Sequence, residues 1–282
     1  MRHQEGVFAG VRNSRLYYQG WLPEGEPKAV LLIVHGLAEH SGRYMNLVNR
    51  FVPQGYALYG IDHLGHGRSA GERLVLERFS DYTESLKTYA AMVGRWQPGK
   101  PVFLVGHSMG GLIAAAYLLT DQEGLSGAVL SGPAIRPPGT IPALTILTGR
   151  LLSLLLPRLG IVPRGPAGDI CRDPAVVAAY LADPLVYQGK LTARLGAELL
   201  GAMARVRREA GRIRLPLLIL QGSADRLVDP AGARILYDGV ASRDKRLILY
   251  EGLYHEVFNE PEHSRVLDDV EHWLAARLGP QP

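Results

Sequence analysis

The segment Gly106-His107-Ser108-Met109-Gly110 places a serine between two glycines where two apolar runs meet. Residues 102–105 read VFLV, and an Ala-rich apolar run begins at Met109. This pattern is typical of a strand that turns sharply into a helix and projects the serine hydroxyl from the turn, because the glycines allow close backbone approach. It favours Ser108 as a nucleophile, with a plain strand-to-helix turn as the alternative.

A serine hydroxyl is a weak nucleophile near neutral pH, so this interpretation requires a base and an acid that orients the base. Asp225 follows the apolar run 217–220, and His255 follows the apolar run 246–250. The order serine, acid, histidine, with each residue just after a strand, is the order used in the α/β-hydrolase fold. We therefore expect Asp225 to be the acid and His255 the base, with an ordinary pKa near ~6.5.

Other residues of the same types have simpler interpretations. Asp229 precedes a proline, which is typical of a helix N-cap. His263 and His272 fall on the last predicted helix, where we expect surface side chains.

A tetrahedral intermediate also needs hydrogen-bond donors for its oxyanion. The backbone N–H of Met109, directly after the nucleophile, is one expected donor. The second should come from the loop after the first apolar run, which reads His35-Gly36-Leu37. Gly36 permits a tight approach there, and we expect Leu37 to offer its N–H.

The elements that must position these residues can be predicted from hydrophobic patterns. Apolar runs rich in β-branched or aromatic residues indicate strands buried on both faces at 29–34, 56–61, 102–105, 127–130, 217–220 and 246–250. Helical patterns lie between them at 44–52, 80–96, 109–120, 230–240 and 261–278. The alternation predicts an α/β-hydrolase fold with a mostly parallel central sheet flanked by helices. Residues 6–23 predict an antiparallel hairpin that turns at Asn13-Ser14.

The alternation stops between Ser131 and Arg214, a segment without a strand pattern but with helical stretches at 174–181 and 191–208. This is longer than an ordinary connection. We predict an inserted helical cap at 133–211 over the carboxyl edge of the sheet, where ligands bind in open α/β folds. Residues 1–132 and 212–282 would form the core.

Composition narrows the function classes. The 282 residues are 47% hydrophobic, with a net charge of +4 and a single cysteine, Cys171. The basic stretch 205–214 indicates a solvated helix face and not a nucleic-acid site. Neither a signal peptide nor a spanning segment is expected, and we predict a cytoplasmic protein. No metal or other cofactor is expected, and the sequence sets no oligomeric state.

Several longer motifs together resemble the monoacylglycerol lipase branch of the α/β-hydrolases. They are HGLAEHSGRY (35–44), DHLGHGRSAG (62–71), GHSMGG (106–111), LQGSADRLVD (220–229) and YEGLYHEVFNE (250–260). The resemblance covers nearly the whole core, and AAYLADPLV (178–186) is similar to the family's cap. It implies the Ser108, Asp225 and His255 triad, with Leu37 and Met109 as oxyanion donors.

The resemblance also implies that Glu39, Arg43, His107 and Tyr180 bind the glycerol head group of the substrate. Three of these residues have a plainer alternative. Arg43 could lie in solvent where a helix begins, Glu39 could cap that helix, and His107 could fill space under the turn.

The expected activity is hydrolysis of monoacylglycerols to fatty acid and glycerol. A lysophospholipase or general lipid esterase of the same branch is the alternative, and a non-catalytic ligand-binding relative is a distant one. An epoxide hydrolase or dehalogenase would need aspartate at position 108. The apolar stretch 142–159 is bracketed by arginines and predicts peripheral membrane contact through the outer surface of the cap.

Overall fold

The central sheet of the computed structural model, which describes residues 1–278, has eight strands in the order β1-β2-β4-β3-β5-β6-β9-β10. β1 and β2 pair antiparallel, as do β2 and β4, and all later pairs in the sheet are parallel. The strands are Arg2–Ala9 (β1), Arg15–Leu22 (β2), Ala29–Val34 (β3), Tyr56–Ile61 (β4), Val102–His107 (β5), Gly127–Ser131 (β6), Leu217–Gly222 (β9) and Lys245–Tyr250 (β10). The predicted mostly parallel α/β-hydrolase sheet is confirmed.

The inner strands are buried on both faces, as their unbroken apolar runs predict. Alternate side chains of β3 enter two different hydrophobic clusters. Val30, Leu32 and Val34 join one cluster, whereas Leu31 and Ile33 join the other. Each cluster needs helices to close it.

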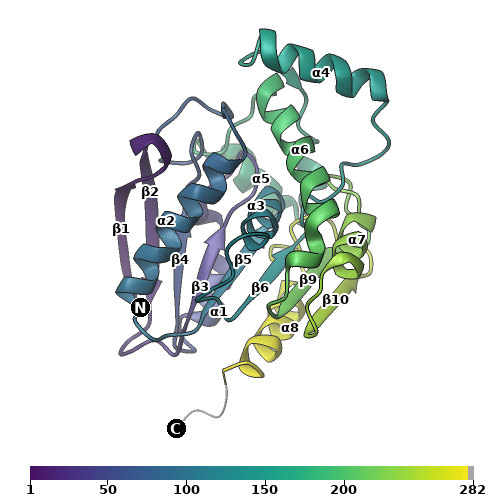
Figure 1. Ribbon diagram of the computed structural model, residues 1–282. Coiled ribbons are helices and arrows are strands. Elements are labelled where there is room, and N and C mark those ends of the chain that lie inside the picture. Colours follow the sequence, from purple (N-terminus) through teal and green to yellow (C-terminus); the bar gives the residue numbers. More distant parts are fainter. Residues whose placement is uncertain (279–282) are drawn as a thin grey trace.

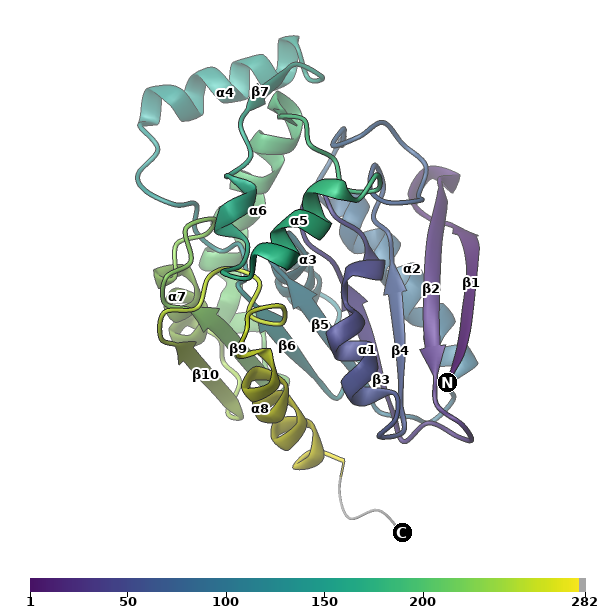
Figure 2. The same cartoon turned by 180° about the vertical axis from the view of Figure 1, so that it is seen from behind.

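The helices cover the two faces of the sheet in separate groups (Figures 1 and 2). The first cluster includes side chains of α2 (Ser80–Trp96), α3 (Met109–Leu118) and α7 (Ala231–Gly239). The second includes side chains of α1 (Met45–Phe51) and α8 (His263–Ala275). Figure 2 shows this second pair on the opposite side of the sheet.

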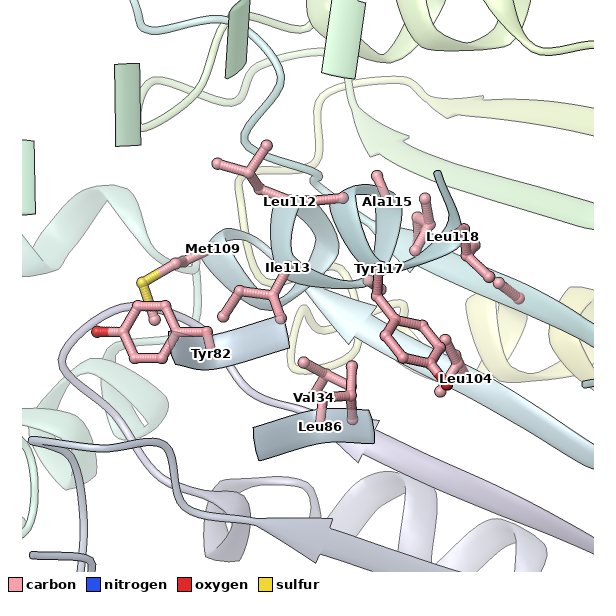
Figure 3. Packing of buried hydrophobic residues seen from close by; sticks show 14 of the residues in the cluster. Val34, Tyr82, Leu86, Leu104, Met109, Leu112, Ile113, Ala115, Tyr117 and Leu118 are labelled. Atoms are coloured by element: carbon pink, nitrogen blue, oxygen red, sulfur yellow. The ribbon is translucent and has the colours of Figure 1, made fainter. Parts of the chain in front are cut away.

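Helix α3, which begins directly after Ser108, is completely buried. All ten of its residues are buried, which is expected for a helix that is apolar around its whole circumference. Figure 3 shows Ile113 and Tyr117 in the same cluster as Val34, Leu86 and Leu104. This packing fixes the start of α3, and with it the residue that precedes the helix.

The segment between β6 and β9 holds α4 (Ala143–Leu155), α5 (Pro174–Ala182) and α6 (Ala193–Glu209). It also contains two short strands, β7 (Gly160–Val162) and β8 (Leu191–Thr192), which pair antiparallel. The expectation that this segment has no strands is therefore wrong. Strands of three and two residues are too short to leave a periodic pattern.

Of the helices in this segment, α4 lies farthest from the sheet and crosses the end of α6 (Figure 1). No helix within residues 1–278 is long and apolar enough to cross a lipid bilayer. The division into a core of 1–132 and 212–282 and a cap of 133–211 stays a prediction, and residues 279–282 lie outside the described part of the chain.

Candidate active site

Ser108 lies between the end of β5 and the start of α3, with φ 54° and ψ −119°. This backbone conformation is sparsely populated by residues other than glycine, and such strain is common at functional turns. The neighbouring glycines make the turn possible. A Cβ added to Gly110 would lie 1.9 Å from the carbonyl oxygen of Val34, and one added to Gly106 would lie 2.7 Å from that of Gly110.

Asp225 and His255 follow β9 and β10 and form a buried hydrogen-bonded pair. The His255 Nδ1 atom lies 2.7 Å from Asp225 Oδ2. The carboxylate also accepts hydrogen bonds from the N–H groups of Leu227 and Val228, and from the Gln221 side chain at 2.9 Å. These contacts fix the Asp225 carboxylate, which in turn orients the imidazole ring.

The pair shifts both ionisation equilibria toward the charged forms. Burial alone would lower the pKa of His255, but the charge of Asp225 and its hydrogen bond raise that pKa above its usual value. Burial alone would raise the pKa of Asp225, but the positive charge of His255 lowers it. Asp225 is thus suited to stabilise a protonated His255.

Ser108 and His255 line the same cavity, which has a volume of about 870 Å³. The described part of the chain shows no hydrogen bond between Ser108 Oγ and the His255 ring. Such bonds are often long in free enzymes and shorten when substrate binds.

Leu37 and Met109 also line this cavity. Met109 is the first residue of α3, and the first N–H groups of a helix have no partner within it. Gly36 brings the other loop close to the nucleophile, since a Cβ added to Gly36 would lie 3.2 Å from Ser108 Cβ. Met109 and the loop that carries Leu37 therefore lie beside Ser108, and their roles as oxyanion donors stay predictions.

The rest of the cavity wall comes mostly from the segment between β6 and β9. Apolar side chains of α4 and α6 line it, including Leu144, Ile146, Leu152, Leu199, Leu200 and Met203. This wall suits an acyl chain, which gains free energy by leaving water.

A polar part of the cavity wall is built from Glu39, Arg43 and Glu256. Arg43 donates to Glu39 at 2.5 Å and makes two bonds to Glu256, at 2.7 and 2.9 Å. Glu39 Oε1 accepts from the Gly36 N–H at 2.6 Å and from the Tyr44 hydroxyl at 2.7 Å. Arg43 therefore does not lie in solvent and Glu39 does not cap the helix; His40 Nδ1 accepts the Gly42 N–H instead.

The remaining predicted head-group residues also reach this wall. The guanidinium carbon of Arg43 lies 4.5 Å from the centre of the Tyr180 ring, which comes from α5. The centre of the His107 ring lies 4.7 Å from that of His255, and burial lowers the pKa of His107 to about 4. The structure thus brings Glu39, Arg43, His107 and Tyr180 together around one end of the cavity.

Comparison with known proteins identifies the family of this chain. Residues 25–262 match the family described as "Serine aminopeptidase, S33". The chain is 42% identical to "Monoacylglycerol lipase" of Mycolicibacterium smegmatis, over 97% of this chain and 98% of that protein. It is 37% identical to "Monoglyceride lipase" of Mus musculus, over 93% of this chain and 88% of that protein.

The chain belongs to the monoacylglycerol lipase family. A crystal structure of the Paleococcus ferrophilus monoacylglycerol lipase superposes with a TM-score of 0.83 at 31% identity, covering 93% of this chain and 99% of that one. The likeness extends over the core and the inserted segment alike.

The sequence does not predict two further residues near the site, Glu256 and Arg164. Glu256 directly follows His255, and its bonds to Arg43 join residues 213 positions apart in the chain. Arg164 donates to the Tyr180 hydroxyl at 2.6 Å. The position of Glu256 beside the candidate base was the one available signal, whereas nothing in the sequence near Arg164 marks it.

Proposed function

We propose that this chain hydrolyses monoacylglycerols to free fatty acid and glycerol through an acyl-enzyme on Ser108. The observation that carries the proposal is the 2.7 Å contact between His255 and Asp225 at the end of an apolar cavity that Ser108 also lines. The family's named members support the same substrate class.

In the proposed mechanism, Ser108 Oγ attacks the ester carbonyl carbon and His255 Nε2 takes the hydroxyl proton. The N–H groups of Leu37 and Met109 stabilise the oxyanion that forms. Protonated His255 gives its proton to the glycerol oxygen, and the C–O bond to glycerol breaks. Water, activated by His255, then attacks the acyl-enzyme and releases the fatty acid. Asp225 keeps Nδ1 protonated throughout.

The cavity divides the substrate between its two walls. The acyl chain would lie along the apolar side chains of α4 and α6, and the glycerol would meet the polar wall that includes Arg43 and Tyr180. Di- and triacylglycerols carry acyl chains where a monoacylglycerol has hydroxyls, so the polar wall would reject them. A lysophospholipase or general lipid esterase remains the alternative.

We also propose a cytoplasmic enzyme that meets lipid surfaces through the cap. The leucines that are more than half exposed on and just after α4 are Leu144, Leu147, Leu151, Leu154, Leu155 and Leu156. Such a contiguous apolar surface, with Arg150 and Arg158 nearby, suits shallow contact with a bilayer. Leu144 and Leu152 also line the cavity, whereas Leu147, Leu151, Leu154, Leu155 and Leu156 are not among its lining residues.

The test is a comparison of kcat/KM for mono-, di- and trioctanoylglycerol, octanoyl lysophosphatidylcholine and a short nitrophenyl ester. We expect monooctanoylglycerol to be the best of the glycerides. Equal hydrolysis of trioctanoylglycerol would contradict a monoacylglycerol lipase while leaving a serine hydrolase intact. A clear preference for the lysophospholipid would favour the alternative.

A further inference from the structure

Two buried carboxylates share a single buried cation at the polar end of the cavity. Glu39 and Glu256 have side chains that are 5% and 6% exposed, and Arg43 is 10% exposed. Each glutamate bonds to the guanidinium, so Glu39, Arg43 and Glu256 form one ionic cluster with a formal charge of −1. All three residues line the cavity.

The hydrogen bonds of the cluster hold both carboxylates against the Arg43 guanidinium. Burial opposes ionisation of Glu39, but Arg43 outweighs it and lowers the pKa of this carboxyl to about 2. Glu256 accepts two bonds from Arg43 and a third from the Asn259 side chain at 2.8 Å. Forked Arg–carboxylate contacts of this kind are among the strongest charge-assisted bonds.

Arg43 is consequently a poor partner for a further anion. Both hydrogens of its Nη1 are used, one by each glutamate, and one Nη2 hydrogen goes to Glu256. The Tyr180 ring covers one face of the guanidinium. An anionic head group would have to compete with two carboxylates that are already in place.

The other cations that line the cavity lie on or near the cap, where water screens them more strongly. Arg150 lies on α4 and is exposed, and Arg226 is 62% exposed and pairs with Asp169. Arg164 is half-buried and donates to the Tyr180 hydroxyl and to Gln188. Apart from Asp225, the charges that act most strongly on His255 are therefore those of the cluster glutamates, Glu256 and Glu39.

We propose that Glu256 is a specificity-determining residue, which makes the head-group end of the cavity net negative and so selects uncharged leaving alcohols over phosphate-bearing ones. The inference rests on the proposed function and deepens it, because it distinguishes a monoacylglycerol from an anionic lysophospholipid by charge. A unit charge at about 8 Å, with an effective dielectric constant of about 20, changes kcat/KM by roughly thirtyfold.

The test compares three esters with the same acyl chain below their micellar concentrations. They are 1-octanoylglycerol, 1-octanoylglycerol 3-phosphate, and the phosphocholine ester, which has phosphate bulk but no net charge. The variant is Glu256→Gln, which removes one charge and keeps the shape. Glu251→Gln, at an exposed position after β10, is the matched control for net charge.

We expect the wild type to prefer 1-octanoylglycerol over the phosphate ester by more than about tenfold, in low salt and in about 0.5 M salt alike, since buried charges are screened little. Glu256→Gln should lower that ratio of kcat/KM values about tenfold or more. The ratio of kcat/KM for 1-octanoylglycerol to that for the phosphocholine ester should not fall by a similar factor. Glu251→Gln should leave every ratio unchanged. Glu256→Gln can also change the basicity of the neighbouring His255, but this change affects all three substrates equally. It therefore cancels in a ratio of kcat/KM values.

Three results would overturn the inference. They are a wild-type ratio near one, a preference for the phosphate ester, and an unchanged ratio in a folded Glu256→Gln variant. If that variant does not fold, Glu39→Gln removes the other carboxylate and must narrow the same ratio. Failure of the proposed function is a separate outcome, because the wild type would then fail to hydrolyse 1-octanoylglycerol, hydrolyse trioctanoylglycerol equally well, or prefer the uncharged phosphocholine ester.

Discussion

The Tyr180 ring, on cap helix α5, covers the guanidinium of Arg43 in the core, with 4.5 Å between the ring centre and Arg43 Cζ. The Tyr180 hydroxyl accepts a hydrogen bond from Arg164 at 2.6 Å. One side chain thus connects the cap to the ionic cluster that borders the head-group end of the cavity. The ring and the hydroxyl have separable contacts, so they can be tested separately.

Tyr180→Leu should lower kcat/KM for 1-octanoylglycerol by an amount equivalent to about 1–3 kcal/mol of transition-state stabilisation, because it removes the ring from a buried cation. Tyr180→Phe keeps the ring and should cost about 1 kcal/mol through the lost hydroxyl. A nitrophenyl ester has no glycerol, so both variants should hydrolyse it almost normally. Equal losses on the two substrates would instead indicate a structural role for Tyr180.

Asp225 and Asp229 lie four residues apart and should behave differently when changed to asparagine. Asp225→Asn disturbs the 2.7 Å contact with His255 and should lower kcat about 10⁴-fold, because the imidazole adopts the wrong tautomer. Asp229 accepts the Ala231 N–H at 2.9 Å, so Asp229→Asn should cost at most about 1 kcal/mol of stability, with near-normal kcat. Reversed effects in steady-state assays and thermal melts would show that the acid is misassigned.

The pH dependence should reflect the raised pKa of His255. The sequence alone predicts an ordinary value near ~6.5, but Asp225 raises the pKa of the buried ring. Catalysis needs the neutral imidazole, so kcat/KM should fall as the pH drops through a kinetic pKa above ~6.5. The measurement is a pH profile with a substrate for which chemistry limits the rate. A midpoint below the ordinary value would contradict the assigned environment.

The exposed leucines of α4 should matter for lipid surfaces and not for chemistry. Leu151 and Leu155 are 55% and 67% exposed and lie one turn apart on α4. Changing both to serine should weaken liposome sedimentation and slow hydrolysis of long-chain monoacylglycerol, while a short nitrophenyl ester is unaffected. Leu249→Ser, at a 54% exposed site on β10, is the control. Lower thermal stability with equal losses on both substrates would mean that these leucines pack inside the cap.

Much of the core could be predicted because its strands are buried on both faces and leave unbroken apolar runs. The predicted strands 29–34 and 56–61 and the helix 80–96 have the bounds that the structure gives them. The hairpin was also expected, but positive φ angles at Arg12 and Asn13 place its turn one residue earlier than Asn13-Ser14.

The parts that could not be predicted depend on contacts between distant segments. The two short strands β7 and β8, between β6 and β9, have too few residues to show a period. Burial of Arg43 follows from Glu256, which comes from the loop after β10, and from Tyr180, which comes from the cap. No local pattern reveals such a partner, so Arg43 could equally have been a solvated residue at the start of a helix.

Hydrolysis of 1-octanoylglycerol by Ser108→Ala, measured as glycerol release, tests the central claim most directly. Ser108 alone would supply the nucleophile, so kcat should fall by about 10⁴-fold or more while the melting temperature stays near that of the wild type. A fluorophosphonate should label Ser108 in the wild type and leave the variant unlabelled. Turnover by the folded variant within about tenfold of the wild type would contradict the account, because an acyl-enzyme on Ser108 could not then carry the reaction.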